Sequence, residues 1–300
     1  MMRLNFPVIA LLLHVPVLSA QDMEGVRAFS GAVPVAGEGI YYLEGRDNLE
    51  YARSMAIQAA RADAIGRAFG TAVTASSHSA IDYVSDGGER NSFSSVMKSL
   101  QRGVWVRDIE EPKVETFLDG DGSFGFKASV RGLARELKSI PVETRGRVLT
   151  GDRTRGATPH EADRLRVGEE FYFSFKAASD GWLAVYMCDE DGTVYRVAPT
   201  VRSGLGVIPV TADVTVVVRD DYLKNVADIR DAGEREVYNR VMFIFSPTPF
   251  TLPLSTDADV ASGIPPTMDY DRFHTWLQEM AVADEHFTVS WQTIRIRRPL

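Results

Sequence analysis

The most regular hydrophobic pattern of the chain lies in residues 166–199. Three apolar, aromatic-rich segments alternate there with polar positions, and Asp180-Gly181 and Asp191-Gly192 fall between them. Alternation with a period of two is typical of strands, and Asp-Gly pairs are typical of tight turns between antiparallel strands. The pattern therefore predicts a β-meander.

The rest of the second half continues with short strands. Apolar runs predict strands at 214–219, 241–245 and 287–296. An amphipathic pattern predicts a helix over 270–282, and the charged stretch 228–240 is expected to form a short helix. These signals predict a mostly antiparallel, immunoglobulin-like β-sandwich with one or two added helices.

The first half predicts a strand, a long helix and then a strand pair. Residues 39–44 alternate as a strand, and Asp47 or Asn48 can cap a helix that ends near Gly70. Alanine dominates the apolar side of this helix, so its axis is expected to approach a sheet closely. Two strand-like runs follow, joined by a hairpin at 119–122. This order predicts an α+β domain.

These elements predict five segments along the chain. They are a signal peptide (1–20), a leader (21–36), an α+β domain (37–137), a linker (138–163) and a β-sandwich domain (164–300). The linker is expected where Pro141 and Pro159 enclose a cluster of Gly, Thr and Arg residues.

The N-terminus has the pattern of an export signal. Arg3 is the only charge before Asp22, an apolar run extends from Phe6 to Leu18, and a cut is predicted after Ala20. A transmembrane anchor is the alternative, but prolines and a histidine interrupt the run, and it is short for a bilayer span. We therefore expect a periplasmic or secreted protein with no transmembrane span in the mature chain.

Charge and cysteine content narrow the classes of function. The formal net charge is −8 at pH 7, and a mixed acidic surface argues against nucleic-acid binding, which needs clustered Lys and Arg. Cys188 is the only cysteine, so no disulfide can form within the chain. Its place in an alternating strand predicts a small buried side chain rather than a reactive thiol.

Two acidic turns invite comparison with calcium sites. Residues 119–123 open a stretch with Phe124 and Val130 where an EF-hand loop needs Gly and Glu. Residues 189–192 also carry carboxylates between two strands. A hairpin turn is the prediction for both stretches, with a weak surface cation site as the alternative for the second.

The remaining chemical signals are isolated. Four histidines form no pair at helical or hairpin spacing, so a zinc site or a catalytic triad would need tertiary contacts to assemble it. They are His78, His160, His274 and His286. The pairs Gly37/Gly39 and Gly204/Gly206 lack the third glycine of a dinucleotide site and are predicted turn residues. We assign no catalytic, cofactor-binding or metal-ligating residue, and no cofactor.

The aromatic residues of the meander allow two interpretations. Alternation puts Phe171, Phe173 and Phe175 on one strand face, which is expected to be sandwich core. The alternative is an exposed aromatic patch that receives a peptide or a glycan. The exposure of Trp105 and Trp182 distinguishes the two.

Several motifs of the second half occur in the order of a known family. They are Arg166-Val-Gly-Glu169, Asp180-Gly-Trp-Leu183, Asp191-Gly192 before Val197-Ala-Pro199, Val207-Ile-Pro209 and Val241-Met-Phe-Ile-Phe-Ser246. On these motifs, residues 165–299 resemble the family called domain of unknown function 4384. The resemblance implies a β-sandwich accessory module of bacterial envelope proteins, without known catalytic residues.

The first half has a resemblance of its own. Gly37-Glu38-Gly39 precedes the alanine-rich helix that ends at Gly70, and strand-like runs follow at 104–109 and 124–130. In this arrangement residues 38–133 resemble the N-terminal domain of the flagellar assembly protein T and the related twenty-kilodalton lipoprotein domain. The resemblance implies a periplasmic scaffolding or envelope role, without implying flagellar function, since the companion domain differs.

We therefore expect an exported bacterial envelope accessory protein that acts as a non-catalytic interaction or scaffolding module, with an envelope protein or a glycan as its partner. A glycan- or peptide-binding β-sandwich protein is the first alternative. A hydrolase with a site between the two domains is the second, suggested by the surplus of carboxylates and the polar loops at 76–95 and 247–266.

Overall fold

The computed structural model describes most of the chain after residue 30. The described residues are 31–43, 48–70, 93, 96–100, 102–120, 122–151, 158–200, 206–219, 224–229, 233–255 and 265–299. The predicted signal peptide and most of the polar loop at 76–95 lie outside them.

Two long helices and fifteen strands are present in the described part of the chain, together with a helical turn at 96–99. The helices are α2 (Leu49–Phe69) and α4 (Tyr270–Ala283). The strands are β1 (Ala32–Tyr42), β2 (Gly103–Leu118), β3 (Phe124–Glu136), β4 (Thr144–Thr150), β5 (His160–Glu161), β6 (Arg164–Arg166), β7 (Glu170–Ala177), β8 (Gly181–Cys188), β9 (Thr193–Ala198), β10 (Ile208–Val210), β11 (Val216–Val218), β12 (Asn225–Val226), β13 (Glu236–Ser246), β14 (Thr267–Asp269) and β15 (Thr288–Arg297).

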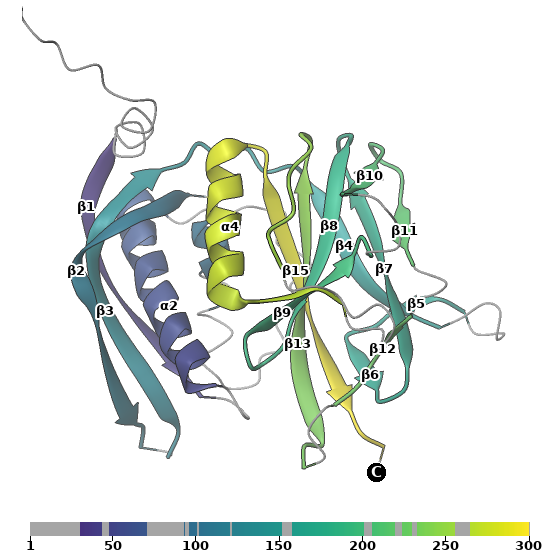
Figure 1. Cartoon of the computed structure of the whole chain (residues 1–300), viewed down its shortest axis with the longest axis horizontal. Helices are drawn as coiled ribbons and strands as arrows, with labels where there is room; N and C mark the ends of the chain where they lie inside the picture. Colours follow the sequence, from purple (N-terminus) through teal and green to yellow (C-terminus); the bar gives the residue numbers. More distant parts are fainter. Residues whose placement is uncertain are drawn as a thin grey trace, which may run out of the picture.

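These elements form a layered molecule (Figure 1). A three-stranded sheet, in the order β1-β3-β2, lies on one side, and α2 and α4 lie between it and a central sheet. The central sheet has the order β14-β9-β8-β13-β15-β6, with β10 beside β8. An outer sheet, β11-β7-β4-β5 with β12 beside β7, covers the far side. The protein is thus mostly β, and among the described strand pairs only β15 and β6 run parallel.

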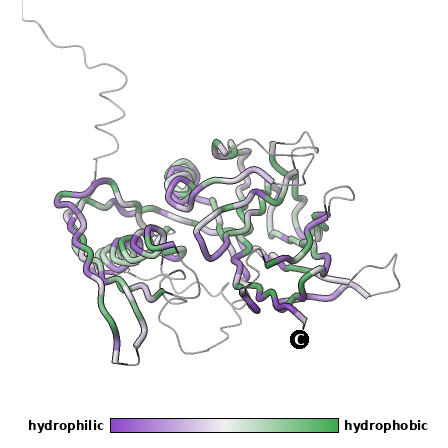
Figure 2. The backbone as a smooth tube through the Cα atoms, turned by 60° about the horizontal axis from the view of Figure 1, so that its bottom comes forward, coloured by the Kyte–Doolittle hydropathy of each residue, from purple (hydrophilic) through white to green (hydrophobic). Residues whose placement is uncertain are grey.

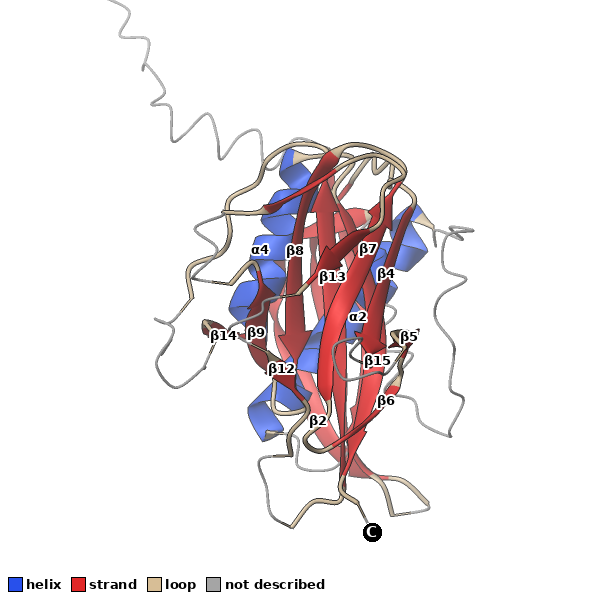
Figure 3. Ribbon diagram, turned by 90° about the vertical axis from the view of Figure 1, so that its right-hand side faces the viewer, coloured by secondary structure: helices blue, strands red, loops and turns tan. Residues whose placement is uncertain are grey.

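The central sheet is covered on both faces, which explains the continuous apolar run of β8. Leu183 and Val185 pack with Phe173 of the outer sheet, while Ala184 and Tyr186 pack with the helices. Figure 3 shows β4 and β7 in front of β8 and β13, with the helices behind. A sheet that is buried on both faces needs apolar residues at successive positions rather than at alternate ones.

One apolar core joins the two halves of the chain. It contains Met55 of α2, Tyr186 and Met242 of the central sheet, and Phe273 and Leu277 of α4. A second core fills the space between the central and outer sheets, and Figure 2 shows hydrophobic stretches in both parts of the molecule. Packing is therefore continuous across the boundary that the sequence predicted between two domains.

The three-stranded sheet packs on α2 through small residues. Asn48 caps the helix by accepting a backbone hydrogen bond at 2.9 Å, and Gly70 ends it, both as predicted. A β-carbon on Gly37 would lie 2.3 Å from Ala60 O, and one on Gly39 would lie 2.3 Å from Ala60 N. The close approach is thus confirmed. The prediction that Gly37 and Gly39 are turn residues is wrong, because both lie inside β1 where only hydrogen fits against the helix.

The free edge of β1 carries two features that oppose pairing with a further strand. Pro34 has no N–H group to donate. The N–H group of Glu38 donates to Asp63 Oδ2 of α2 at 3.0 Å, so it is already used. Asp63 is held in turn by Arg67, whose Nε donates to Oδ1 at 2.9 Å. Edge strands without such protection are templates for association between chains.

Two predicted irregular segments contain strands. β1 begins at Ala32, inside the predicted leader (21–36), because its ladder with β3 runs as far as Arg135. Residues 138–163, predicted as a linker, contain β4, which pairs along its whole length with β7. Strand pairing overrides the local proline and glycine signals in this second segment.

The charged stretch 228–240 is not the short helix that its composition suggested. Its last five residues begin β13, and the described residues before them are not helical. Glu236 explains the charge pattern, because Arg295 and Arg297 of the paired strand β15 bind its carboxylate at 2.8 and 2.6 Å. Glu236 is therefore a cross-strand partner of two arginines rather than part of one face of a helix.

Candidate functional site

The two halves of the chain are in contact at Tyr51, in the first turn of α2. Its hydroxyl accepts a hydrogen bond from Nη1 of Arg240 in β13 at 3.1 Å. A β-carbon on Gly192, in the turn before β9, would lie 2.5 Å from the Tyr51 ring, and the Tyr270 ring of α4 meets it edge-on at 5.7 Å. The contact of α2 with α4 and the central sheet is named the helix seam below.

Arg240 brings a positive charge to the helix seam. Its guanidinium lies 4.5 Å from the ring centroid of Phe93, which is the geometry of a cation–π interaction. Phe93 in turn meets Trp291 of β15 edge-on at 5.9 Å. Arg240 therefore links the central sheet to α2 through Tyr51 and to the segment before β2 through Phe93.

The first turn of α4 is also tied to α2. The Ser54 hydroxyl donates a hydrogen bond to Oδ1 of Asp271. Asp269 caps α4 by accepting the N–H of Arg272 at 2.9 Å. Both carboxylates lie at the N-terminal end of α4, where the helix dipole favours negative charge. These carboxylates therefore stabilise the helix and its contact with α2.

Burial raises the pKa values of the Cys188 thiol and the Tyr270 hydroxyl in the helix seam. The pKa of the Cys188 thiol is raised to about 12, mainly because burial disfavours the thiolate, although the nearby Arg240 charge opposes this. Burial also raises the pKa of the Tyr270 hydroxyl above its usual value. Cys188 is fully buried, which confirms the prediction of a small buried side chain, and its neutral thiol is a poor nucleophile.

His274 is a buried polar residue on α4. Its side chain faces the helix seam, where its ring stacks on Tyr270 with the centroids 6.0 Å apart. Burial, together with the charge of Arg61, lowers the pKa of His274 to about 3. Arg61 itself pairs with Asp108 of β2 at 2.8 Å and lies over the Trp105 ring at 5.4 Å. The imidazole is therefore held in its neutral form.

The other histidines lie apart from this one. His160 is exposed in β5, and Nδ1 of His286, two residues before β15, lies 2.9 Å from Ile140 O. His78 lies outside the described residues. In the part of the chain that the structure describes, no group of three His, Cys, Asp or Glu side chains is placed to hold a metal ion.

The two acidic turns share one backbone geometry. The N–H of Asp119 donates to Ser123 O at 2.8 Å, and the N–H of Asp189 donates to Thr193 O at 3.0 Å. In each turn a glycine three residues after the first Asp donates back to that Asp and has a positive φ of 89° or 82°. Both hairpin predictions are therefore confirmed.

The carboxylates of the second turn are occupied by backbone donors. Asp191 accepts the N–H of Thr193 at 2.8 Å, and Glu190 accepts the N–H of Tyr238 at 2.6 Å. With its amide oriented to suit its neighbours, Asn239 donates to Asp189 at 2.9 Å. These bonds fasten the β8–β9 turn to β13, and they place Gly192 against α2.

The aromatic residues of β7 are core. Phe171, Phe173 and Phe175 are at most 4% exposed and pack on the central sheet, as Phe175 does on Phe243 with the centroids 6.1 Å apart. Trp105 is also buried, over the Cα of Gly132, and Trp182 is half-buried. The prediction of a sandwich core is confirmed for the β7 phenylalanines.

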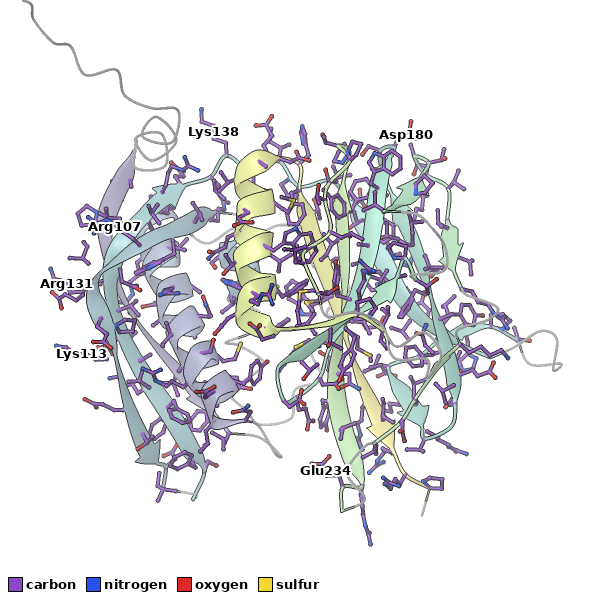
Figure 4. The ribbon with its side chains drawn as sticks, in the orientation of Figure 1. Arg107, Lys113, Arg131, Lys138, Asp180 and Glu234 are labelled. Atoms are coloured by element: carbon purple, nitrogen blue, oxygen red, sulfur yellow. The ribbon has the colours of Figure 1, made fainter. Side chains whose placement is uncertain are left out.

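The outer face of the three-stranded sheet is charged and open to solvent. Arg107, Lys113 and Arg131 point away from α2 there (Figure 4). Arg131 pairs with Glu110 at 2.6 Å across the β2–β3 ladder. An antiparallel sheet can keep one face in water in this way, while its other face is buried on a helix. This face is the candidate interaction surface.

No protein-family model matches the chain, and no curated protein matches it either. The two family resemblances of the sequence therefore stay predictions. Within the described residues, neither helix is long and apolar enough to cross a bilayer.

Sequence reasoning did not find three residues of the helix seam. Tyr51, Arg61 and Arg240 were not candidates, because each stands alone in a segment with a different dominant pattern. One signal was available for Arg240, which immediately precedes the fully apolar run of β13. A lone cation next to a buried strand must be paired or placed against polar or aromatic groups.

Proposed function

We propose that this protein is an exported, non-catalytic accessory protein of the bacterial envelope, which positions a partner protein through the outer face of its three-stranded sheet. The observation that carries the proposal is the contrast between the two faces of that sheet. One face is buried on α2, whereas the other presents Arg107, Lys113 and Arg131 to solvent on a protein whose net charge is −8.

The chemistry of the helix seam supports a non-catalytic role. Cys188 and His274 carry the side chains there that could act as a nucleophile or a general base, and both are buried in their neutral forms. A nucleophile or a general base needs a pKa close to the working pH and access to substrate. The turn carboxylates are likewise bound to backbone N–H groups rather than directed at a common point.

The finer assignments form part of the same proposal. The second half is an immunoglobulin-like sandwich of the kind that the domain of unknown function 4384 implies, and the first half is an α+β module like those of periplasmic scaffolding proteins. The mostly antiparallel sheets support the first assignment, and a helix packed on a three-stranded antiparallel sheet supports the second. Export would place both modules in the envelope.

Affinity capture with charge-reversed variants tests the proposal. The chain from residue 21 onward would be used as bait in a bacterial envelope extract, beside the variant Arg107→Glu/Lys113→Glu/Arg131→Glu. The variant Arg145→Glu/Lys176→Glu, on the outer sheet, is the matched control. We expect one envelope protein to be captured by the wild type and the control and lost from the first variant. Equal capture by all three chains, or capture of no protein, contradicts the proposal.

A further inference from the structure

The imidazole of His274 lies in the helix seam with little access to water. The residue is 3% exposed, and its Nε2 atom has no hydrogen-bond partner among the described residues. A neutral imidazole tolerates such a site, because one ring nitrogen can go without a partner at modest cost. A protonated imidazole has two N–H donors and a charge, and burying an unpaired charge is far more costly.

The charged and titratable groups around this imidazole offer no compensation. From α2, Arg61 presents a second positive charge, and its own carboxylate partner, Asp108, lies behind it on β2. From α4 itself, Tyr270 stacks on the ring. Cys188 and Arg240 of the central sheet interact electrostatically with the Tyr270 hydroxyl. The remaining acidic group of that turn, Asp271, is bonded to Ser54 of α2.

The helix seam is also a plane that no backbone ladder crosses in the described part of the chain. The three-stranded sheet forms one ladder system and the central sheet another, and no strand pairing in the described part of the chain connects them. Side-chain contacts across the seam hold the two parts together, such as the bonds of Tyr51 to Arg240 and of Ser54 to Asp271. Separating the two parts therefore costs packing and a few polar contacts, but no backbone ladder.

We propose that protonation of His274 in mildly acid solution separates α4 from α2, so that the helix seam works as a pH-operated joint between the three-stranded sheet and the sandwich. Opening gives the imidazolium access to water and relieves its repulsion with Arg61. The segment that connects the two parts stays with the sandwich, because Ile140 donates its N–H to Glu285 O at 2.7 Å. Acid thus changes the position of the candidate interaction surface relative to the sandwich.

The reactivity of Cys188 reports directly on this opening. Cys188 is fully buried against the helix seam, and a disulfide reagent that reacts in acid, such as 4,4′-dithiodipyridine, labels it only when the seam opens. Between pH 6.5 and the pH at which the seam stands fully open, we expect the labelling rate to rise about tenfold for each unit of pH lowered. The far-UV circular dichroism should stay unchanged over the same range, which separates opening from unfolding.

Two histidine variants decide the matter. His274→Gln should lose the acid-dependent rise, whereas His160→Gln, at an exposed position, should keep it. A second test uses the Ser54→Cys/Asp271→Cys pair, whose disulfide should hold the seam shut and stop labelling of Cys188 in acid. Identical pH profiles for the wild type and His274→Gln overturn the proposal.

A direct measurement remains decisive if His274→Gln does not fold. The NMR titration of the wild-type imidazole should follow the labelling rate of Cys188, because the ring takes a proton only when the seam opens. A His274 that titrates near pH 6.5 while the Cys188 rate stays constant also overturns the proposal.

Discussion

Gly39 of β1 and Ala60 of α2 are in backbone contact: a β-carbon on Gly39 would lie 2.3 Å from the amide nitrogen of Ala60. Replacing Gly39 with Ala must therefore push α2 away from the three-stranded sheet. We expect a loss of about 1–3 kcal/mol in the free energy of unfolding, measured by urea denaturation. Gly120→Ala is the matched control, since nothing lies within 4 Å of its β-carbon position, and it should change stability by less than about 0.5 kcal/mol.

The hydrogen bond between Arg240 and Tyr51 should contribute measurably to stability. Tyr51→Phe keeps the ring against Gly192 and removes the hydroxyl, which accepts the 3.1 Å bond from Arg240 and also hydrogen-bonds with the Cys188 thiol. We expect a loss of about 1–2 kcal/mol, because the bond involves a charged donor that is partly withdrawn from water. A double-mutant cycle with Arg240→Met would measure the coupling. A coupling energy indistinguishable from zero would show that the bond contributes nothing.

His274 should make the protein less stable in acid. Its pKa is about 3 in the folded protein, below the value of 6.5 for an exposed histidine. Above pH 6.5 neither the folded nor the unfolded state binds this proton. Below it the unfolded state binds a proton that the folded state with a closed helix seam refuses, so the free energy of unfolding falls by about 1.4 kcal/mol for each pH unit until the seam opens.

The measurement is urea denaturation at pH 7.5 and pH 5.0. Wild type should lose about 2 kcal/mol more than His274→Gln between the two conditions. His160→Gln, at an exposed site, should behave like the wild type. Equal losses for the wild type and His274→Gln would show that other groups account for the acid sensitivity.

Cys188 should resist alkylation in the folded protein. Its thiol is fully buried and its pKa is raised to about 12, so almost none of it is thiolate at pH 8. We expect iodoacetamide to modify the native chain at least about a hundred times more slowly than the urea-unfolded chain, as followed by mass spectrometry. Similar rates for the two states would mean that the thiol is accessible and reactive.

The free edge of β1 should pair with another chain once its protection is removed. Pro34→Val restores a backbone donor, and Asp63→Ala releases the N–H of Glu38. The double variant is expected to dimerise at micromolar concentration in analytical ultracentrifugation, while the wild type sediments as a monomer under the same conditions. Arg67→Ala, which leaves Pro34 and Asp63 in place, is the control and should remain monomeric.

Strand periodicity and cap residues allowed much of the fold to be predicted. The three strands at 170–198, the cap at Asn48, the end at Gly70 and both acidic hairpins follow from local physical rules that operate within a few residues. The predicted β-meander is wrong at its first turn, because β7 pairs with β4 in the outer sheet, whereas β8 pairs with β9 in the central sheet. The helix over 270–282 was also predicted within one residue at its C-terminal end. These features depend on residues that are close together along the chain, and such residues can be read directly from the sequence.

The assembly of the layers could not be predicted in the same way. Gly37 and Gly39 are turn residues by composition, and only the position of Ala60 across the layer shows why they are glycines. Likewise Glu236 belongs to a charged stretch until β15 brings Arg295 and Arg297 beside it. The helix seam depends on such distant contacts throughout, which is why Tyr51 gave no signal in the sequence and Arg240 gave only that of a lone cation beside an apolar run.

The occupied N–H of Glu38 and the missing donor of Pro34 affect how the protein behaves at high concentration. Proteins with an unpaired edge strand can polymerise into fibres at high concentration, because the edge of one copy can pair with the edge of the next. In this protein the Asp63 carboxylate accepts the N–H of Glu38, so that donor of the β1 edge is already used. We therefore expect copies of the protein not to associate through this edge of β1, even at high concentration.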